Sequence, residues 1–118
     1  MKYPIGRNGA LNFSSTATIR VFDQAWPNGS RAVLDLVATF VTATGVRRIS
    51  RTYRVERIGS LTVTEVGTAD DPLASAVPGA AAALLLGDAT LALDLTPGAA
   101  GTGVVWEIAG HFLSTATS

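Results

Sequence analysis

The 118-residue sequence has no cysteine, a formal net charge of zero, and 47% hydrophobic but only 15% charged residues. The lack of cysteine excludes disulfide bonds, thiolate zinc sites and cysteine nucleophiles. The balanced charge excludes a bulk field that would attract nucleic acid or an anionic membrane, and no apolar run approaches the roughly 20 residues that span a bilayer. Because ordinary domains carry about 25% charged residues, we expect this one to cover part of its surface with another chain.

The N-terminal residues 1–10 contain one proline and two glycines and predict an irregular arm that is either disordered or docked on a neighbouring subunit. They lack the apolar segment of a signal peptide, so we expect synthesis in the cytoplasm without export. Residues 11–114 show no compositional break and predict a single β domain. The small polar residues 115–118 predict a flexible tail.

Three consecutive strands follow the turn at Trp26-Pro27-Asn28-Gly29-Ser30. Arg31–Thr44 alternates regularly but is apolar on both faces, which indicates a central strand or an interface. Val46–Ile58 runs back after a turn at Thr44-Gly45, and Leu61–Val66 supplies the third strand. These segments predict an antiparallel meander.

The chain then changes character. Asp70-Asp71-Pro72 has the pattern of a helix start, with an aspartate cap and a proline in the first turn. Leu73–Val77 would follow as a short helix, and Ala80–Leu86 would add one or two helical turns that cover the open end of the sheet. Alternation returns in Ala89–Thr96 and Val104–Leu113, which predict the last strands.

The expected fold is therefore mostly β. We predict an antiparallel β-sandwich or small barrel of about six to eight strands, with a short helical insert near residues 71–86. Periodicity does not encode strand order, so the choice between sandwich and barrel stays open at this point.

No complete set of catalytic or ligand-binding residues is recognisable. The single histidine, His111, has only Ser114 close in sequence and lies outside any nucleophile motif. The carboxylates lack the spacing of a calcium loop, and the glycine-rich stretch 98–103 lacks the Lys-Ser/Thr of a phosphate loop. We predict no enzyme activity, no catalytic residue, no cofactor and no metal.

The one charge cluster lies on the second strand of the meander and divides between its two faces; it consists of Arg47, Arg48, Arg51, Arg54 and Arg57. With Tyr53 among them, these arginines could bind single-stranded nucleic acid. They could instead keep an exposed strand in solution, and overall neutrality favours this interpretation over nucleic-acid binding. A third interpretation is that they face the acidic patch of a partner protein.

Aromatic residues suggest one further contact. Trp106 shares its face with Val104 and Ile108 and is expected in the core, whereas Trp26 beside its turn is expected at the surface. Together with the arm, the two-sided strand and the arginine cluster, this reasoning gives a set of candidate interface residues: Tyr3, Ile5, Arg7, Trp26, Val37, Val41, Arg48, Tyr53 and Arg54.

In its short length, lack of cysteine and Thr/Ala/Gly-rich strands, the chain resembles small β-rich virion proteins of tailed bacteriophages. The segments Arg51-Thr52-Tyr53-Arg54-Val55-Glu56-Arg57 and Gly103-Val104-Val105-Trp106-Glu107-Ile108 carry this resemblance. It implies attachment to a symmetric shell or tail as a capsid decoration, head-fibre or tail accessory protein, often as a homo-oligomer. It assigns a role to no individual residue.

We therefore expect a non-enzymatic structural or assembly protein, located in a virion, whose partners are other virion proteins or further copies of itself. Membranes are not expected as partners. An alternative is a glycan- or protein-binding β module, such as a receptor-binding or adhesion domain. A cytoplasmic enzyme or small-ligand barrel is the third hypothesis.

Overall fold

The computed structural model describes residues 2–26, 28–86 and 90–114, without the side chains of residues 2–7, 22, 24, 86 and 111–114. The described part of the chain contains the strands β1 (Lys2–Asn12), β2 (Ile19–Ala25), β3 (Ser30–Val41), β4 (Val46–Ile58), β5 (Ser60–Glu65), β6 (Ala81–Leu86), β7 (Thr90–Thr96) and β8 (Gly103–Ser114). One 3-10 turn, η1 (Ala74–Ala76), lies between β5 and β6.

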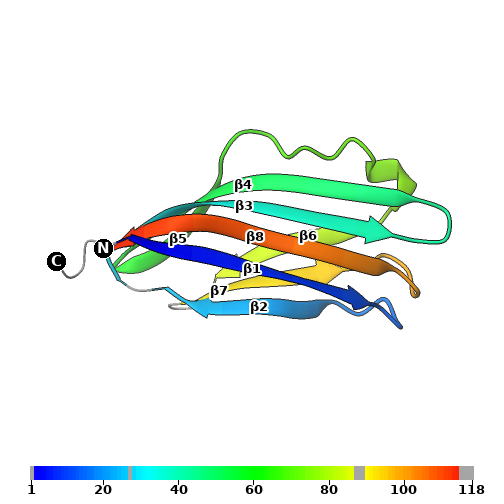
Figure 1. Cartoon of the computed structure of the whole chain (residues 1–118), viewed down its shortest axis with the longest axis horizontal. Coiled ribbons are helices and arrows are strands. Elements are labelled where there is room, and N and C mark those ends of the chain that lie inside the picture. The colour runs from blue at the N-terminus through cyan, green and yellow to red at the C-terminus, as the bar shows by residue number, and fades with distance from the viewer. Residues whose placement is uncertain (1, 27, 87–89, 115–118) are drawn as a thin grey trace.

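The strands form two antiparallel sheets, a five-stranded one in the order β1-β8-β3-β4-β5 and a three-stranded one in the order β2-β7-β6. The long strands run side by side in Figure 1, with β6 and β7 visible behind them, and the molecule measures 51 × 25 × 20 Å. The mostly β prediction is confirmed. Of its two alternatives, the structure has two open sheets around one core and no closed barrel among the described strands.

The core lies between the inner faces of the two sheets. On β3 every second side chain, including Leu34, Leu36 and Phe40, is fully buried, while the intervening ones face outward. β7 contributes buried leucines at alternate positions from the opposite sheet. Burying a leucine or phenylalanine side chain stabilises the fold by about 1.5–3 kcal/mol. Since β3 lies between β8 and β4, the prediction of a central strand at Arg31–Thr44 is confirmed.

The N-terminal segment differs from the prediction. Residues 2–10 belong to β1, which pairs with β8 over its whole length, so the prediction of an irregular arm is wrong for them. An edge strand tolerates Pro4 because only one of its two edges must supply ladder hydrogen bonds. Gly9 fits because a Cβ there would approach the Trp106 ring nitrogen to 3.0 Å. The predicted tail at 115–118 lies outside the described residues.

The helical insert is reduced to the single 3-10 turn η1, and the prediction that Ala80–Leu86 is helical is wrong. Residues 81–86 form β6, in which Leu84 pairs with Leu93 of β7 and packs against the core. A six-residue segment is too short to be stable as a helix on propensity alone, whereas the ladder with β7 and the buried Ala82 stabilise the strand. No helix among the described residues is long and apolar enough to cross a membrane.

Candidate contact surface

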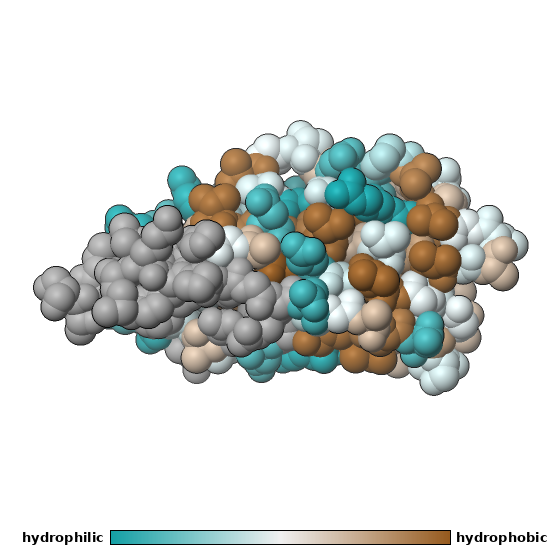
Figure 2. Space-filling view, viewed as in Figure 1, coloured by the Kyte–Doolittle hydropathy of each residue, from teal (hydrophilic) through white to brown (hydrophobic). Residues whose placement is uncertain are grey.

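The outer face of the five-stranded sheet carries a group of exposed or half-buried apolar side chains near the β3–β4 turn. We call it the valine cluster; it consists of Ala10 on β1, Val105 on β8, Val37 and Val41 on β3, and Val46 on β4. Val105 is 59% exposed, Val41 45% and Val46 44%. In Figure 2 apolar groups on this side of the molecule lie beside polar ones.

The register of the sheet explains why these residues gather. Val105 lies opposite Ala10 on one side and Thr39 on the other, and Val41 lies opposite Val46. Cross-strand neighbours on one face have Cβ atoms about 5 Å apart, which gives two apolar pairs, Ala10 with Val105 and Val41 with Val46. Val37 and Val41 lie diagonal to Val105 on either side of Thr39, so four strands contribute to a patch that Thr39 interrupts. β-branched residues suit strands, but the core does not require them on the outward side.

Two charged residues flank the valine cluster on opposite sides of β3. Glu107 on β8 lies opposite Val37, and Arg48 on β4 lies opposite Thr39. Both side chains are exposed, and neither forms an ion pair with another described residue.

Charges farther along the same face are already paired. Arg54 Nε lies 3.1 Å and Arg31 Nε 3.4 Å from the carboxylate of Glu56. Asp35 accepts a hydrogen bond of 2.9 Å from the Thr52 hydroxyl. Exposed pairs of this kind contribute about 0–1 kcal/mol each. Among the described residues, the unpaired charges nearest to the valine cluster are Arg48, Glu107 and the exposed Asp70, which pairs with Ser50 through the backbone.

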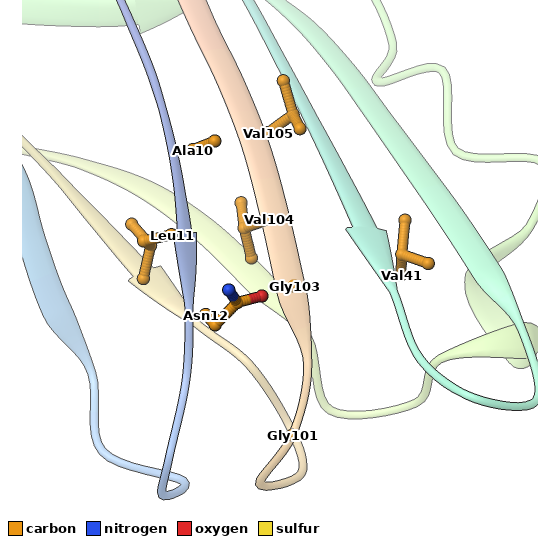
Figure 3. Close-up of a pocket in the computed structure, with 8 residues that line it drawn as sticks. All are labelled: Ala10, Leu11, Asn12, Val41, Gly101, Gly103, Val104 and Val105. Carbon is orange, nitrogen blue, oxygen red and sulfur yellow. The ribbon is translucent and has the colours of Figure 1, made fainter.

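A shallow hollow opens where the valine cluster meets the end of the sheet. Its volume is about 410 Å³, and Figure 3 shows the residues that line it: Ala10, Leu11, Asn12, Val41, Gly101, Gly103, Val104 and Val105. None of these residues has an ionisable side chain. A second hollow of about 430 Å³ also borders Ala10 and Val105, and Glu107 is its one ionisable residue. The hollows offer shape and apolar surface rather than acid–base chemistry.

A different arrangement lies at the start of β4, on the inward face of the sheet; we call it the Arg47 latch. The Arg47 guanidinium donates to both carboxylate oxygens of Asp71, at 3.1 and 2.6 Å, and to the carbonyl oxygens of Val77 and Ala80, at 3.1 and 2.9 Å. The Arg47 side chain is 14% exposed. The latch fastens the segment 66–80 to the sheet.

Two further observations define the latch. The hydrogen bonds from Arg47 hold the pKa of the Asp71 carboxyl below its ordinary value, although partial burial acts in the opposite direction. A Cβ at Gly45 would come within 2.6 Å of the Ala76 carbonyl oxygen, so the β3–β4 turn and η1 are in close contact. The prediction that Asp71 caps a helix is wrong, because no side chain caps η1 and Asp71 binds Arg47 instead.

The remaining inner arginines of β4 also bind within the chain. Arg57 donates to the Trp26 carbonyl oxygen at 2.7 Å, and Arg51 donates to the Tyr53 hydroxyl at 3.5 Å. The five arginines therefore do not form one basic face: Arg47, Arg51 and Arg57 are turned inward, and Arg48 and Arg54 outward.

Four of the candidate interface residues, Val37, Val41, Arg48 and Arg54, lie on the outer face of the sheet. The first three lie near one another, whereas Arg54 lies opposite Val33 and away from the valine cluster. The placement of Trp26 and Tyr53 as surface contacts is wrong: Trp26 is 1% and Tyr53 6% exposed.

Both errors have a physical reason. The indole of Trp26 donates to the Ser30 carbonyl oxygen at 3.3 Å, which holds the ring beneath its turn. Tyr53 shares the inward parity of Ile49 and Val55.

The other residues singled out from the sequence fall where the structure gives no side chains. Tyr3, Ile5 and Arg7 lie on β1 with side chains outside the described set, and so do His111 and Ser114 on β8. Among the residues that are described, no three His, Cys, Asp or Glu side chains gather as a metal site would require. Sequence reasoning did not select Ala10, Val46, Val105 and Glu107. The alternation along β8 could have indicated Val105 and Glu107, because they face away from the buried Val104 and Trp106.

No protein-family model and no curated protein matches this chain. Two solved structures resemble it. One is the tailspike protein gp49 from Acinetobacter baumannii bacteriophage Fri1, a capsular polysaccharide depolymerase, at 15% identity and a TM-score of 0.48, covering 92% of this chain and 17% of that one. The other is the Acinetobacter baumannii phage AM24 tailspike protein, at 10% identity and a TM-score of 0.46, covering 98% and 27%. This chain thus spans less than a third of either protein, and a likeness at this level carries no argument about function.

Proposed function

We propose that this domain is a non-enzymatic structural module that acts by protein–protein contact as a component of a phage virion. The observation that carries the proposal is the valine cluster, an exposed apolar patch that four strands build on one face of the larger sheet. Removing apolar surface from water is favourable by about 25 cal/mol per Å², and this gain opposes the entropic cost of association. Contiguous apolar patches on a folded domain mark sites of contact.

A non-enzymatic role is supported by the composition of the two hollows. Acid–base or nucleophilic catalysis requires at least two suitably placed groups, and only Glu107 among the lining residues of either hollow is ionisable. The Arg47 latch holds the second group of charged side chains. Arg47 binds backbone carbonyl oxygens and one carboxylate within the chain, so its hydrogen bonds hold the segment 66–80 against the sheet.

The virion setting is supported by the resemblance in sequence style to phage decoration, head-fibre and tail accessory proteins. The glycan-binding alternative is not favoured by the described aromatic side chains. Sugars stack on exposed aromatic rings, but the five aromatic side chains that the structure describes are all buried: Phe13, Trp26, Phe40, Tyr53 and Trp106.

The proposal is tested by mass spectrometry of virions purified on a density gradient from the source of the sequence. We expect the chain in fixed stoichiometry with the structural proteins. A Val105→Glu variant, altered at an exposed position, is expected to fold normally by circular dichroism and to be incorporated at least about tenfold less well.

Thr64→Glu is the matched control, since it adds the same charge at an exposed, outward position of β5 away from the valine cluster. Absence of the wild-type chain from virions would overturn the virion setting. Normal incorporation of a folded Val105→Glu variant would overturn the role of the valine cluster.

A further inference from the structure

We infer that the outer face of the five-stranded sheet binds a second copy of this chain, with β8 of each copy lying over β4 of the other. This inference rests on the proposed function, because it names the partner of the valine cluster. Its basis is the placement of opposite charges on the two sides of β3, Glu107 beside Val37 and Arg48 beside Thr39, two residues farther along.

The geometry follows from strand order. β3 lies between β8 and β4. Two such sheets packed face to face, about 10 Å apart, can be related by a two-fold axis that runs along β3. Each outward residue of β3 then faces its own copy, so Val37 and Val41 form the centre of the contact. The same rotation exchanges β8 and β4, which gives a self-complementary interface.

The charges fit this exchange. In the described part of the chain the carboxylate of Glu107 on β8 and the guanidinium of Arg48 on β4 both lack an ion-pair partner. Glu107 shares its row of the sheet with Ser50 of β4, so the rotation places it opposite Ser50 of the second copy. Arg48 of that copy is two residues farther along the same strand, about 7 Å away, which a long arginine side chain spans. The symmetry forms this pair twice.

Asp70 pairs with Ser50 at the edge of β4 and is exposed on the same face, so Arg48 faces this carboxylate as well as Glu107 of the second copy. Asp35 also lies on β3 and would face its own copy, but the Thr52 hydroxyl binds its carboxylate at 2.9 Å and draws it toward β4, away from the axis. Arg31 and Arg54 share the single carboxylate of Glu56, which offsets one of their two positive charges within each chain. The zero net charge of the chain lets two copies approach without bulk repulsion.

A charge-reversal experiment by sedimentation equilibrium tests the inference. The wild-type chain is expected to dimerise, and Glu107→Arg and Arg48→Glu are each expected to raise the dimer Kd at least about tenfold. An equimolar mixture of the two variants regains both opposite-charge pairs, so it is expected to form a heterodimer with near wild-type affinity. The double variant is expected to dimerise by itself for the same reason.

Two results would overturn the inference. One is a wild-type chain that stays monomeric up to about 1 mM, a concentration that would detect association as weak as about −4 kcal/mol. The other is a mixture in which dimerisation is not restored. Circular dichroism of each variant separates loss of contact from loss of fold.

Cross-linking gives a second measurement that does not depend on charge. The chain has no cysteine, and Thr39 lies on β3 between Val105 and Arg48, so the thiol of a Thr39→Cys variant would face its own copy. A short bis-maleimide is expected to join the two copies of this variant and to leave the matched Thr64→Cys variant on β5 monomeric. Equal cross-linking of both variants would contradict the arrangement.

The two proposals fail in different ways. If the wild-type chain is monomeric while Val105→Glu still blocks incorporation into virions, the valine cluster binds a different protein and only the self-contact is wrong. If the chain dimerises through this face but is absent from virions, the self-contact stands and the virion setting is wrong.

Discussion

The two faces of the five-stranded sheet use similar residues for different purposes. On β3 the inward Leu34, Leu36 and Phe40 are fully buried against the second sheet, while the outward Val33, Val37 and Val41 have no sheet over them. Core packing accounts for the apolar character of the first group. For the second group the fold accounts only for the preference of valine for strands. A strand that is apolar on both sides therefore contains one signal that folding explains and a second that we propose serves contact.

The same separation appears between neighbouring arginines of β4. Arg47 points inward and forms four hydrogen bonds in the latch, whereas Arg48 points outward with no ion pair to any described residue. Parity along the strand, rather than residue type, separates the structural side chains from those available for contact. Substitutions on the two faces should therefore differ in their effect on stability, most of all in the core and least on the outer face.

The largest effect is expected in the core. Leu36→Ala should lower the free energy of unfolding by about 2–5 kcal/mol, because it removes buried methyl groups and leaves a cavity. Urea denaturation followed by tryptophan fluorescence measures the change. The outward neighbour provides the control, since Val37→Ala should cost less than about 1 kcal/mol. Similar losses at the two positions would contradict the division between inner and outer faces.

The next largest effect concerns the latch. Arg47→Ala leaves the Asp71 carboxylate and the carbonyl oxygens of Val77 and Ala80 without their donor, and it should lower the free energy of unfolding by about 2 kcal/mol. Arg47→Lys keeps the charge but not the planar fork, so its stability should fall between those of the wild type and Arg47→Ala. Arg48→Ala is the matched control and should stay within about 0.5 kcal/mol of the wild type in the same urea titration.

The latch also predicts how stability depends on pH. The folded state holds the pKa of Asp71 below its unfolded value, so its contribution is complete above the ordinary carboxyl pKa and is lost as pH falls through the lowered folded pKa. The stability difference between the wild type and Asp71→Asn should therefore shrink as the pH is lowered from about 6 to about 3. Urea midpoints of both proteins across this range give the measurement. A stability difference that grows toward acid pH would show that folding raises the pKa of Asp71 instead of lowering it.

Alternation predicted the strands from Arg31 to Val66 and the inward and outward positions on β3 and β4, because one buried face imposes a period of two. It could not predict β6, since Ala81–Leu86 is helix-forming in isolation and becomes a strand only through its pairing with β7. Nor could it predict β1, in which Pro4 and the glycines suggested an irregular arm and pairing with the distant β8 decides the conformation.

The candidate surface was predictable in part for the same reason. Val37 and Val41 stand out in a single strand, but Val105 and Ala10 join them only through the register of β1, β8 and β3. Trp26 is an error of the opposite kind, because a tryptophan beside a turn suggests an exposed ring. The ring is buried instead, and its nitrogen donates a hydrogen bond to the Ser30 carbonyl oxygen. Long-range pairing thus supplies what local pattern lacks.

The smallest change in stability should accompany the largest change in assembly. Replacing Val37, Val41 and Val105 together by threonine keeps the β-branched shape and the strand preference, and it alters side chains that are exposed or only half-buried. The free energy of unfolding should change by no more than about 0.5 kcal/mol per site, while association through the outer face should weaken because apolar surface is no longer removed from water. Urea denaturation and sedimentation equilibrium on the same sample measure both quantities. If stability and association fell together, the outer valines would belong to the folding core, and the distinction between the two faces of the sheet would not hold.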